Sequence, residues 1–210
     1  MRMTDLEPEY RAGGRAVVVL PGAVFHVRGT AGPSPGELDE VVFLNQVHGA
    51  CILHDPAGTE EGDGMILTCQ GGYPGIRTAD CLPVFLWSRT FSAALHAGWR
   101  GIAEGIAGRM LRMLPASPDF IVLGNCICPD CYTVGEDVRI RVAGPAPARE
   151  HPRGRLDLKL AFRDQLKEAG LPPETVVFNM PECTCCREDM FHSYRRDGTE
   201  KRNLQWLAVG

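Results

Sequence analysis

Short apolar runs separated by turn residues are the main pattern along this chain. Runs of four to seven alternating or continuously apolar residues, bounded by Gly, Pro, Asn or Asp, predict β-strands. The expected strands are Ala16–Leu20, Ala23–Val27, Val41–Val47, Gly64–Thr68, Pro83–Trp87, Phe91–His96, Phe120–Leu123, Thr175–Phe178 and Leu204–Val209.

Two longer segments show helical periodicity, in which apolar residues recur every three or four positions. These segments are Gly101–Leu114 and Leu156–Ala169. Their apolar positions are Ile102, Ile106, Met110 and Met113 in the first, and Leu160, Phe162, Leu166 and Ala169 in the second. Gly170 and the two prolines after it predict the end of the second helix.

Strands dominate the first half of the chain and do not alternate strictly with helices, which favours an α+β fold over a doubly wound α/β fold. A length of 210 residues fits one substantial core, so we expect a single domain over residues 1–210. The Pro-rich stretch Gly144–Gly154 is expected to be a loop within that domain.

Composition and charge limit which classes of binding partner are expected. Hydrophobic residues make up 44% of the chain and charged residues 23%, both ordinary for a globular protein. A net charge of -4 gives no long-range attraction for nucleic acid or anionic membranes, which predicts neither as a partner. The segment Met1–Tyr10 carries three acidic residues and does not resemble a signal peptide, so a cytoplasmic protein is predicted.

Three short strings carry the candidate chemistry. They are Gln46–Gly49, Thr78–Pro83 and His96–Gly101, and they supply His48, Cys81 and His96. Two imidazoles and one thiolate suit zinc, and three protein ligands would leave one position for water or substrate, as in a catalytic centre. Taken singly, each residue has an ordinary alternative: Cys81 as a small buried hydrophobe, and the histidines as turn or surface residues.

The three strings, together with Gly124–Pro129, Tyr132–Val138 and Cys183–Gly198, resemble the YfiH family of laccase-domain proteins, once described as multicopper polyphenol oxidases. The resemblance implies layered mixed β-sheets flanked by helices, in a YfiH-like cysteine hydrolase fold. It also implies that His48, Cys81 and His96 bind zinc. The implied reactions are phosphorolysis of adenosine, inosine, guanosine and methylthioadenosine, and deamination of adenosine.

Within that hypothesis, Asp80 is the candidate to assist proton transfer. Phosphate needs positive donors, and Arg28 is the first candidate because Phe25–Gly29 resembles the family's arginine element, although Val27 replaces a threonine there. Arg195 is the second, with neighbouring Arg196 expected to point the other way along a strand. The shortened segment before His48 sets this chain apart from the family. Trp99 and Arg100 are expected to brace the turn beneath His96.

Three other functions remain open at this stage. An amidase that removes L-serine from peptidoglycan precursors would use the same metal or a Cys81 nucleophile. A copper-dependent polyphenol oxidoreductase is the second, because His/Cys sites bind copper tightly. The six histidines are too few for a multicopper laccase. The third is a non-enzymatic zinc module, which would need a fourth ligand. A monomer or small homo-oligomer is expected.

The nine cysteines include two clusters, Cys126/Cys128/Cys131 and Cys183/Cys185/Cys186. We interpret these clusters as C-x-C-x-x-C and C-x-C-C runs that lack the paired C-x-x-C spacing of zinc ribbons. Reduced structural thiols are therefore the favoured interpretation, ahead of a second metal or an iron–sulfur site.

Overall fold

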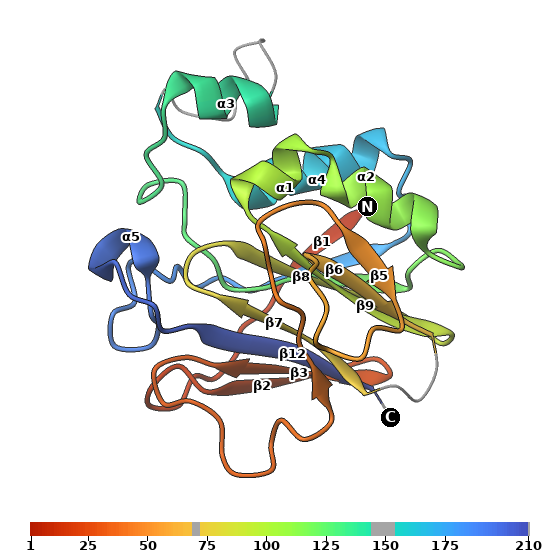
Figure 1. Cartoon of the computed structure of the whole chain (residues 1–210), viewed down its shortest axis with the longest axis horizontal. Coiled ribbons are helices and arrows are strands. Elements are labelled where there is room, and N and C mark those ends of the chain that lie inside the picture. Colours follow the sequence, from red (N-terminus) through yellow and green to blue (C-terminus); the bar gives the residue numbers. More distant parts are fainter. Residues whose placement is uncertain (69–71, 144–153, 210) are drawn as a thin grey trace.

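Two β-sheets and one layer of helices lie on top of one another in the computed structural model (Figure 1). The structure describes residues 1–68, 72–143 and 154–209. The seven-stranded sheet has the order β1 (Arg2–Asp5), β11 (Val176–Asn179), β10 (Phe120–Leu123), β8 (Leu82–Ser88), β9 (Phe91–Ala97), β6 (Gly64–Leu67) and β5 (Ile52–His54). The five-stranded sheet has the order β2 (Ala16–Leu20), β3 (Ala23–Arg28), β12 (Asn203–Val209), β7 (Tyr73–Thr78) and β4 (Val41–Val42).

The helices are α1 (Trp99–Ala103), α2 (Ile106–Met113), α3 (Glu136–Ala143), α4 (Leu158–Glu168) and α5 (Tyr194–Asp197). Of these, α1, α2 and α4 cover one face of the seven-stranded sheet. None of the helices in the described ranges has the length and apolar character needed to cross a bilayer.

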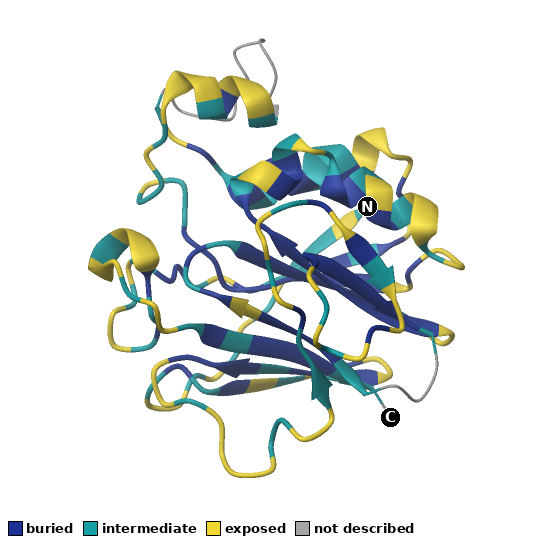
Figure 2. Ribbon diagram, in the orientation of Figure 1, coloured by how far each residue is buried: buried dark blue, intermediate teal, exposed yellow. Residues whose placement is uncertain are grey.

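The seven-stranded sheet is buried on both faces, as Figure 2 shows for its central strands. Along β8, Val84 and Leu86 pack with the helices, whereas Phe85 faces the other sheet and lies 5.2 Å from Phe25 between ring centroids. Alternate side chains of one strand therefore enter two different cores. This explains why the central strands appear in the sequence as nearly continuous apolar runs.

Most expected strands are confirmed within one or two residues, and the α+β class is confirmed. The expected strand Val41–Val47 is wrong after Val42: Asn45 makes only an isolated bridge to Glu61, and the chain then turns into the loop that carries His48. Strands β1, β5 and β7 were not predicted. The predicted loop Gly144–Gly154 lies, except for Gly154, outside the described residues.

The expected helix Gly101–Leu114 is divided into α1 and α2 by Gly105, which has a left-handed φ of 77°. Glycine adopts this conformation without steric cost, so the chain changes direction there while Ile102 and Ile106 both stay buried. Helix α4 starts later than predicted, because the side chain of Asp157 caps it by accepting a hydrogen bond from the backbone N–H of Leu160.

Candidate active site

His48, Cys81 and His96 come together at one end of the seven-stranded sheet. Strands β8 and β9 are antiparallel neighbours in which Pro83 lies opposite His96, so Cys81, just before β8, reaches the same end of the sheet as His96. The loop after β4 brings His48 to this point. One ligand atom from each residue lies within 4.8 Å of the others, and the two imidazole rings are 4.7 Å apart at 84°.

Asp63, which the sequence interpretation did not select, holds two of these residues in place. Its side chain is fully buried, and Oδ1 lies 2.7 Å from Nδ1 of His96. Since a carboxylate can only accept, Nδ1 carries the proton, and the other ring nitrogen of His96 is left for a metal. The backbone N–H groups of His48 and Gly49 also donate to Asp63, at 2.9 and 2.7 Å.

These hydrogen bonds fix an unusual backbone conformation at His48, whose φ is 62°. A non-glycine residue in the left-handed region is strained and needs support from its surroundings. Gln46 adds support from the other side. Its side-chain amide accepts from Arg77 N at 2.9 Å and donates to Arg77 O at 2.8 Å, so the loop is held against β7.

Two glycines keep the space around the three residues open. A Cβ atom at Gly98 would lie 3.1 Å from Sγ of Cys81, inside the site. A Cβ atom at Gly101 would lie 2.6 Å from the carbonyl oxygen of Gly49, which real structures do not tolerate. The glycines of the His96–Gly101 string are therefore needed for close packing of α1 against the His48 loop.

Charge at the centre is balanced between a thiolate and an imidazolium. Burial by itself would raise the pKa of Cys81, but the neighbouring His96 and His48 outweigh it and lower that pKa to about 6. Burial would lower the pKa of His96, but Cys81 and Asp63 raise it to about 9. Burial likewise opposes ionisation of Asp63, and hydrogen bonds from His96 and Gly49 lower its pKa nonetheless. In the metal-free protein all three groups thus favour their charged forms near neutral pH, and a metal would displace the proton from the second ring nitrogen of His96.

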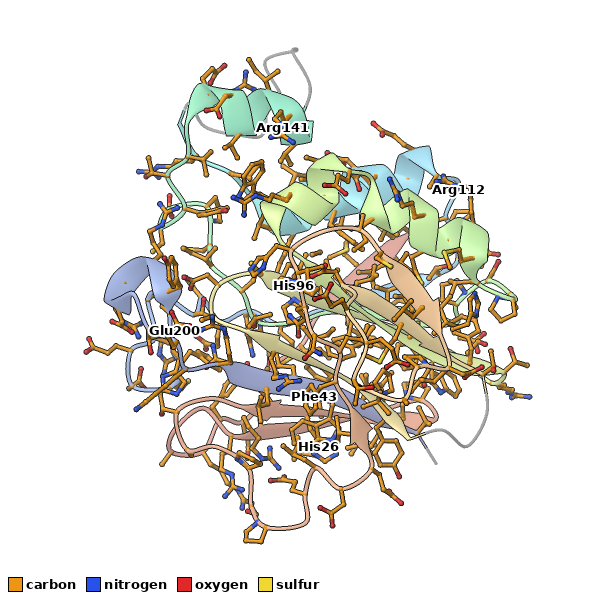
Figure 3. The ribbon with its side chains drawn as sticks, in the orientation of Figure 1. His26, Phe43, His96, Arg112, Arg141 and Glu200 are labelled. Atoms are coloured by element: carbon orange, nitrogen blue, oxygen red, sulfur yellow. The ribbon has the colours of Figure 1, made fainter. Side chains whose placement is uncertain are left out.

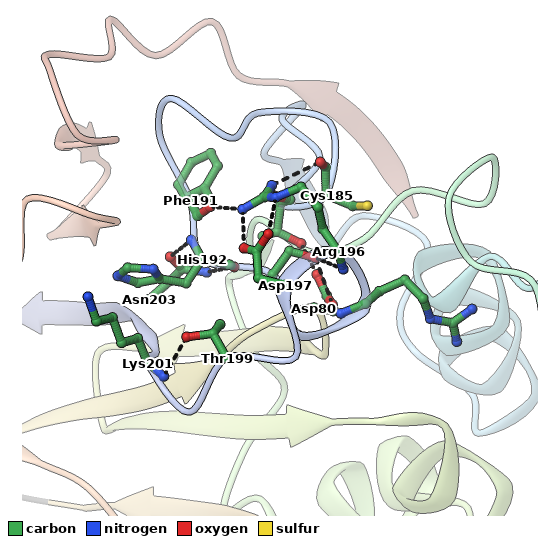
Figure 4. A network of polar contacts seen from close by, with 12 residues as sticks. Asp80, Cys185, Phe191, His192, Arg196, Asp197, Thr199, Lys201 and Asn203 are labelled. Atoms are coloured by element: carbon green, nitrogen blue, oxygen red, sulfur yellow. Dashed lines mark hydrogen bonds and ion pairs between the residues drawn. The ribbon is translucent and has the colours of Figure 1, made fainter.

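Asp80 lines the same cleft as Cys81, but its carboxylate is bound by other parts of the protein. Its buried carboxylate accepts hydrogen bonds from Thr184 Oγ1 at 2.7 Å, Ser193 Oγ at 3.0 Å and the backbone N–H of Arg195 at 2.7 Å. Figure 4 shows this network beside Arg196 and Asp197. With both oxygens occupied by protein donors, Asp80 positions the segment that carries Arg195 rather than standing ready to transfer a proton.

The three candidate ligands lie in a cleft of about 710 Å³, which is large enough for a small molecule. Aromatic and basic side chains share its wall. The aromatic residues are Trp99, Tyr132 and Tyr194, and the basic residues are Arg77, Arg100, Arg195 and Arg202. Trp99 and Arg100 therefore line the cleft, which corrects the expectation that they only brace a turn.

Arg28 is not among the residues that line this cleft. It lies on the five-stranded sheet beside the labelled His26, whereas His96 lies near the helical layer (Figure 3). Its buried guanidinium pairs with Glu37, donates to Val27 O at 2.7 Å and lies 5.2 Å from the Trp206 ring centroid. The expectation that Arg28 binds phosphate in this cleft is corrected, because its charge is already neutralised by Glu37.

Arg195 does reach the cleft, but from helix α5 and not from a strand as expected. Its Nη1 donates to the carbonyl oxygen of Thr133 at 2.6 Å, and its guanidinium lies 5.0 Å from the ring centroid of Tyr132. Arg196 is used internally, by Asp197 and by the carbonyl oxygens of Thr184 and Cys185. Only Arg195 of the two neighbouring arginines lines the cleft, as predicted, although both residues lie in a helix and not in a strand.

The donor set fits one zinc ion. Two imidazoles and a thiolate whose ligand atoms lie within 4.8 Å of one another can close on one cation with small side-chain movements. Zinc-bound histidines generally donate their other ring N–H to a carboxylate or a carbonyl oxygen, and Asp63 accepts that hydrogen bond from His96. Within the described residues no further His, Cys, Asp or Glu joins this group, so one coordination position faces the cleft.

The comparison with known proteins agrees with the motifs. Residues 29–209 match the family described as multi-copper polyphenol oxidoreductase laccase, and the chain belongs to that family, which confirms the predicted YfiH relationship. It is 34% identical to the purine nucleoside phosphorylase YlmD of Geobacillus stearothermophilus, over 81% of this chain and 73% of that one. The adenosine deaminase RL5 of an unknown prokaryotic organism is 31% identical over 77% and 72% of the two chains.

The crystal structure of YlmD from Geobacillus stearothermophilus has a similar fold. It superposes with a TM-score of 0.81 and 28% sequence identity, over 96% of this chain and 98% of that chain. The arrangement of two sheets and a helical layer is therefore shared with a protein of this family over nearly the whole length.

The buried Asp63 carboxylate generates one prediction. Asp63→Asn replaces an acceptor oxygen by a donor that would face N–H groups, and it removes the charge that fixes His96. We expect zinc affinity to fall by about 10–100-fold, as for other changes behind metal ligands. Competition with a chromophoric chelator measures this. Asp55→Asn is the matched control, because among the described residues the side chain of Asp55 bonds only Thr68. Equal affinity of the two variants would contradict the account.

The charged Cys81–His96 pair generates a second prediction. In chelator-treated, metal-free protein, alkylation of Cys81 should rise with pH through a midpoint near 6, because the thiolate is the reactive form. Mass spectrometry of each cysteine peptide measures the rate. Cys126 is the internal control, since burial raises the pKa of this thiol to about 12 and it should stay unreactive. A Cys81 midpoint at the ordinary value of about 8.5 would show that the two histidines do not stabilise the thiolate.

Proposed function

We propose that this chain is a zinc-dependent purine nucleoside phosphorylase that also deaminates adenosine. The observation that carries the proposal is the three-ligand centre in a cleft whose wall combines arginines with aromatic rings. The names of the relatives support it, because YlmD is a purine nucleoside phosphorylase and RL5 an adenosine deaminase. Adenosine, inosine, guanosine and methylthioadenosine are the proposed substrates.

His48, Cys81 and His96 would hold the zinc ion, with Asp63 orienting His96 and the His48 loop. When bound, zinc supplies Lewis-acid chemistry and lowers the pKa of water enough for hydrolysis near neutral pH. Deamination replaces the amino group at C6 of adenine by oxygen and releases ammonia. Cys81 would bind the ion as a thiolate, because the neighbouring His96 and His48 lower its pKa to about 6.

Phosphorolysis places different demands on the cleft. Phosphate attacks C1′ of the ribose, the bond from C1′ to the purine nitrogen breaks, and the products are the free base and ribose 1-phosphate. The phosphate needs positive donors that no carboxylate has neutralised. Arg77, Arg100 and Arg195 meet this condition: in the described parts of the chain, none has a carboxylate oxygen within ion-pair distance.

Among these residues, Arg195 is the proposed phosphate ligand. Its hydrogen bond to Thr133 O and its stacking over Tyr132 fix the plane of the guanidinium, which reduces the entropy lost on binding. The Asp80 carboxylate accepts from the Arg195 backbone N–H and so anchors the same residue from beneath. Tyr132 and Tyr194 are left to contact the purine and ribose.

Copper-dependent polyphenol oxidation is the second candidate, favoured by the description of the family. A mixed His and Cys ligand set binds copper at least as tightly as zinc. Among the described residues only one group combines histidine with cysteine, however, so a multicopper centre of the laccase type has no counterpart there. Copper-loaded protein that turns over a polyphenol but no nucleoside would favour this second function.

The function is tested by incubating zinc-loaded protein with a panel of nucleosides, with and without phosphate. We expect free base and ribose 1-phosphate only with phosphate, and ammonia from adenosine in both cases. Cys81→Ala should lose the metal at the cleft centre and both reactions, because one site serves them. Cys51→Ala, which removes an exposed thiol outside the cleft, is the control that should retain both. Full-rate phosphorolysis by Cys81→Ala that lacks the cleft metal would contradict the proposal.

The phosphate site is tested by Arg195→Lys. Loss of the planar, doubly donating guanidinium should weaken phosphate-dependent cleavage by about 1–3 kcal/mol, seen mainly as a higher KM for phosphate. Deamination, which uses no phosphate, should change little. Arg112→Lys, on the exposed side of α2, is the matched control (Figure 3). An equal loss of both reactions in Arg195→Lys would mean that Arg195 supports the cleft wall only.

A further inference from the structure

Four cysteines outside the cleft centre come together from two distant segments. Cys128 and Cys131 follow β10, and Cys183 and Cys186 follow β11; their sulfur atoms all lie within 4.8 Å of one another. Each segment contributes a C-x-x-C pair. Both pairs are present in the sequence but are concealed by the additional cysteines Cys126 and Cys185, which corrects the expectation that this spacing is absent.

The spacing of the sulfur atoms matches one tetrahedral metal ion. Zinc–thiolate bonds of about 2.3 Å place neighbouring sulfurs about 3.8 Å apart in a tetrahedron. Sγ of Cys186 lies 3.3 Å from that of Cys131 and 3.9 Å from that of Cys128. These distances exceed a disulfide bond of about 2.05 Å, and all four residues are free cysteines. A cubane iron–sulfur cluster would hold its thiolates farther apart.

Backbone amides in the two segments are turned toward sulfur. The N–H groups of Cys128 and Cys186 both point at Sγ of Cys183, at 3.1 and 3.4 Å. Donors of this kind offset the negative charge of a thiolate, as hydrogen-bond partners of metal ligands do. An isolated parallel bridge between Cys126 and Cys183 holds the two segments in register beside the sulfurs.

We propose that Cys128, Cys131, Cys183 and Cys186 bind a second zinc ion as a closed tetrathiolate site. Four protein ligands leave no position for water or substrate, so the site is structural, unlike the His48–Cys81–His96 centre. Cys126 and Cys185 belong to the same runs but are not members of the group.

The site would join two segments that form one wall of the cleft. Beyond the first pair, Tyr132 lines the cleft; beyond the second pair, Arg195 does. Asp80 bonds both segments as well, accepting from Thr184 and, through its carbonyl oxygen, from the backbone N–H of Ile127. Loss of the second zinc should therefore loosen the position of Tyr132 and Arg195. On the proposed function, the KM for phosphate should rise while the metal content of the first centre stays unchanged.

Metal analysis of a variant without the cleft centre tests the proposal. His48→Ala/Cys81→Ala protein should retain one zinc ion per chain, which adding Cys186→Ser should abolish. Adding Cys185→Ser, a change one residue away in the same run, should leave the zinc content at one. A zinc-free double variant, or equal zinc content after Cys186→Ser and Cys185→Ser, would overturn the proposal.

A second measurement uses the natural sequence and does not depend on the folding of any variant. Zinc-loaded protein is alkylated, and the modified cysteines are identified by mass spectrometry before and after chelation. Cys128, Cys131, Cys183 and Cys186 should be protected together and become reactive together when zinc is removed, while Cys51 reacts in both states. Replacement of zinc by cobalt should add the absorption of a tetrathiolate centre. A Cys131–Cys186 disulfide, or four thiols that react equally with and without zinc, would contradict the site.

Discussion

The buried carboxylate of Asp63 is the group on which the cleft centre depends. It bonds His96, a strand residue, and the backbone N–H groups of Val47, His48 and Gly49, which belong to a loop with little regular structure. Without this charge the three N–H groups would lose their acceptor, and the left-handed conformation of His48 would keep only the support that Gln46 gives the loop. Breaking a buried charged pair by removing one partner typically costs about 3–5 kcal/mol. The local fold and the ligand geometry therefore depend on the same residue.

Asp80 does the equivalent work for the segment that carries Arg195. Its two oxygens accept from Thr184, Ser193 and the Arg195 backbone, and these contacts hold α5 and the segment before it over the sheet end. The proposed tetrathiolate site adjoins this network, since Thr184 lies between Cys183 and Cys186 in the chain and donates to Asp80. The Arg195 segment is thus held by the Asp80 carboxylate and adjoins the cysteine cluster, whereas the His48 loop is held by Asp63.

The sequence predicted those strands and helices whose own pattern of apolar residues determines them. Central strands such as Leu82–Ser88 were recognisable because both faces are buried. Strand β7 was missed because Gly75 interrupts its apolar pattern; the structure shows why a glycine is needed, since a Cβ there would lie 2.5 Å from Val41 and 2.6 Å from Phe43. The convergence of the cleft residues followed from family motifs. Asp63 and the Arg28–Glu37 pair could not be found this way, because contacts between separate segments of the folded chain decide whether a charged residue serves the site or the scaffold.

Anomalous diffraction from zinc-loaded crystals, recorded on both sides of the zinc absorption edge, tests the central claim most directly. The account predicts an anomalous peak bonded to His48, Cys81 and His96 at about 2.0–2.3 Å, with the remaining position open to the cleft. Anomalous density confined to the cysteine cluster would contradict it. So would a fourth protein ligand at the cleft centre, because a closed site could neither activate water nor admit a substrate.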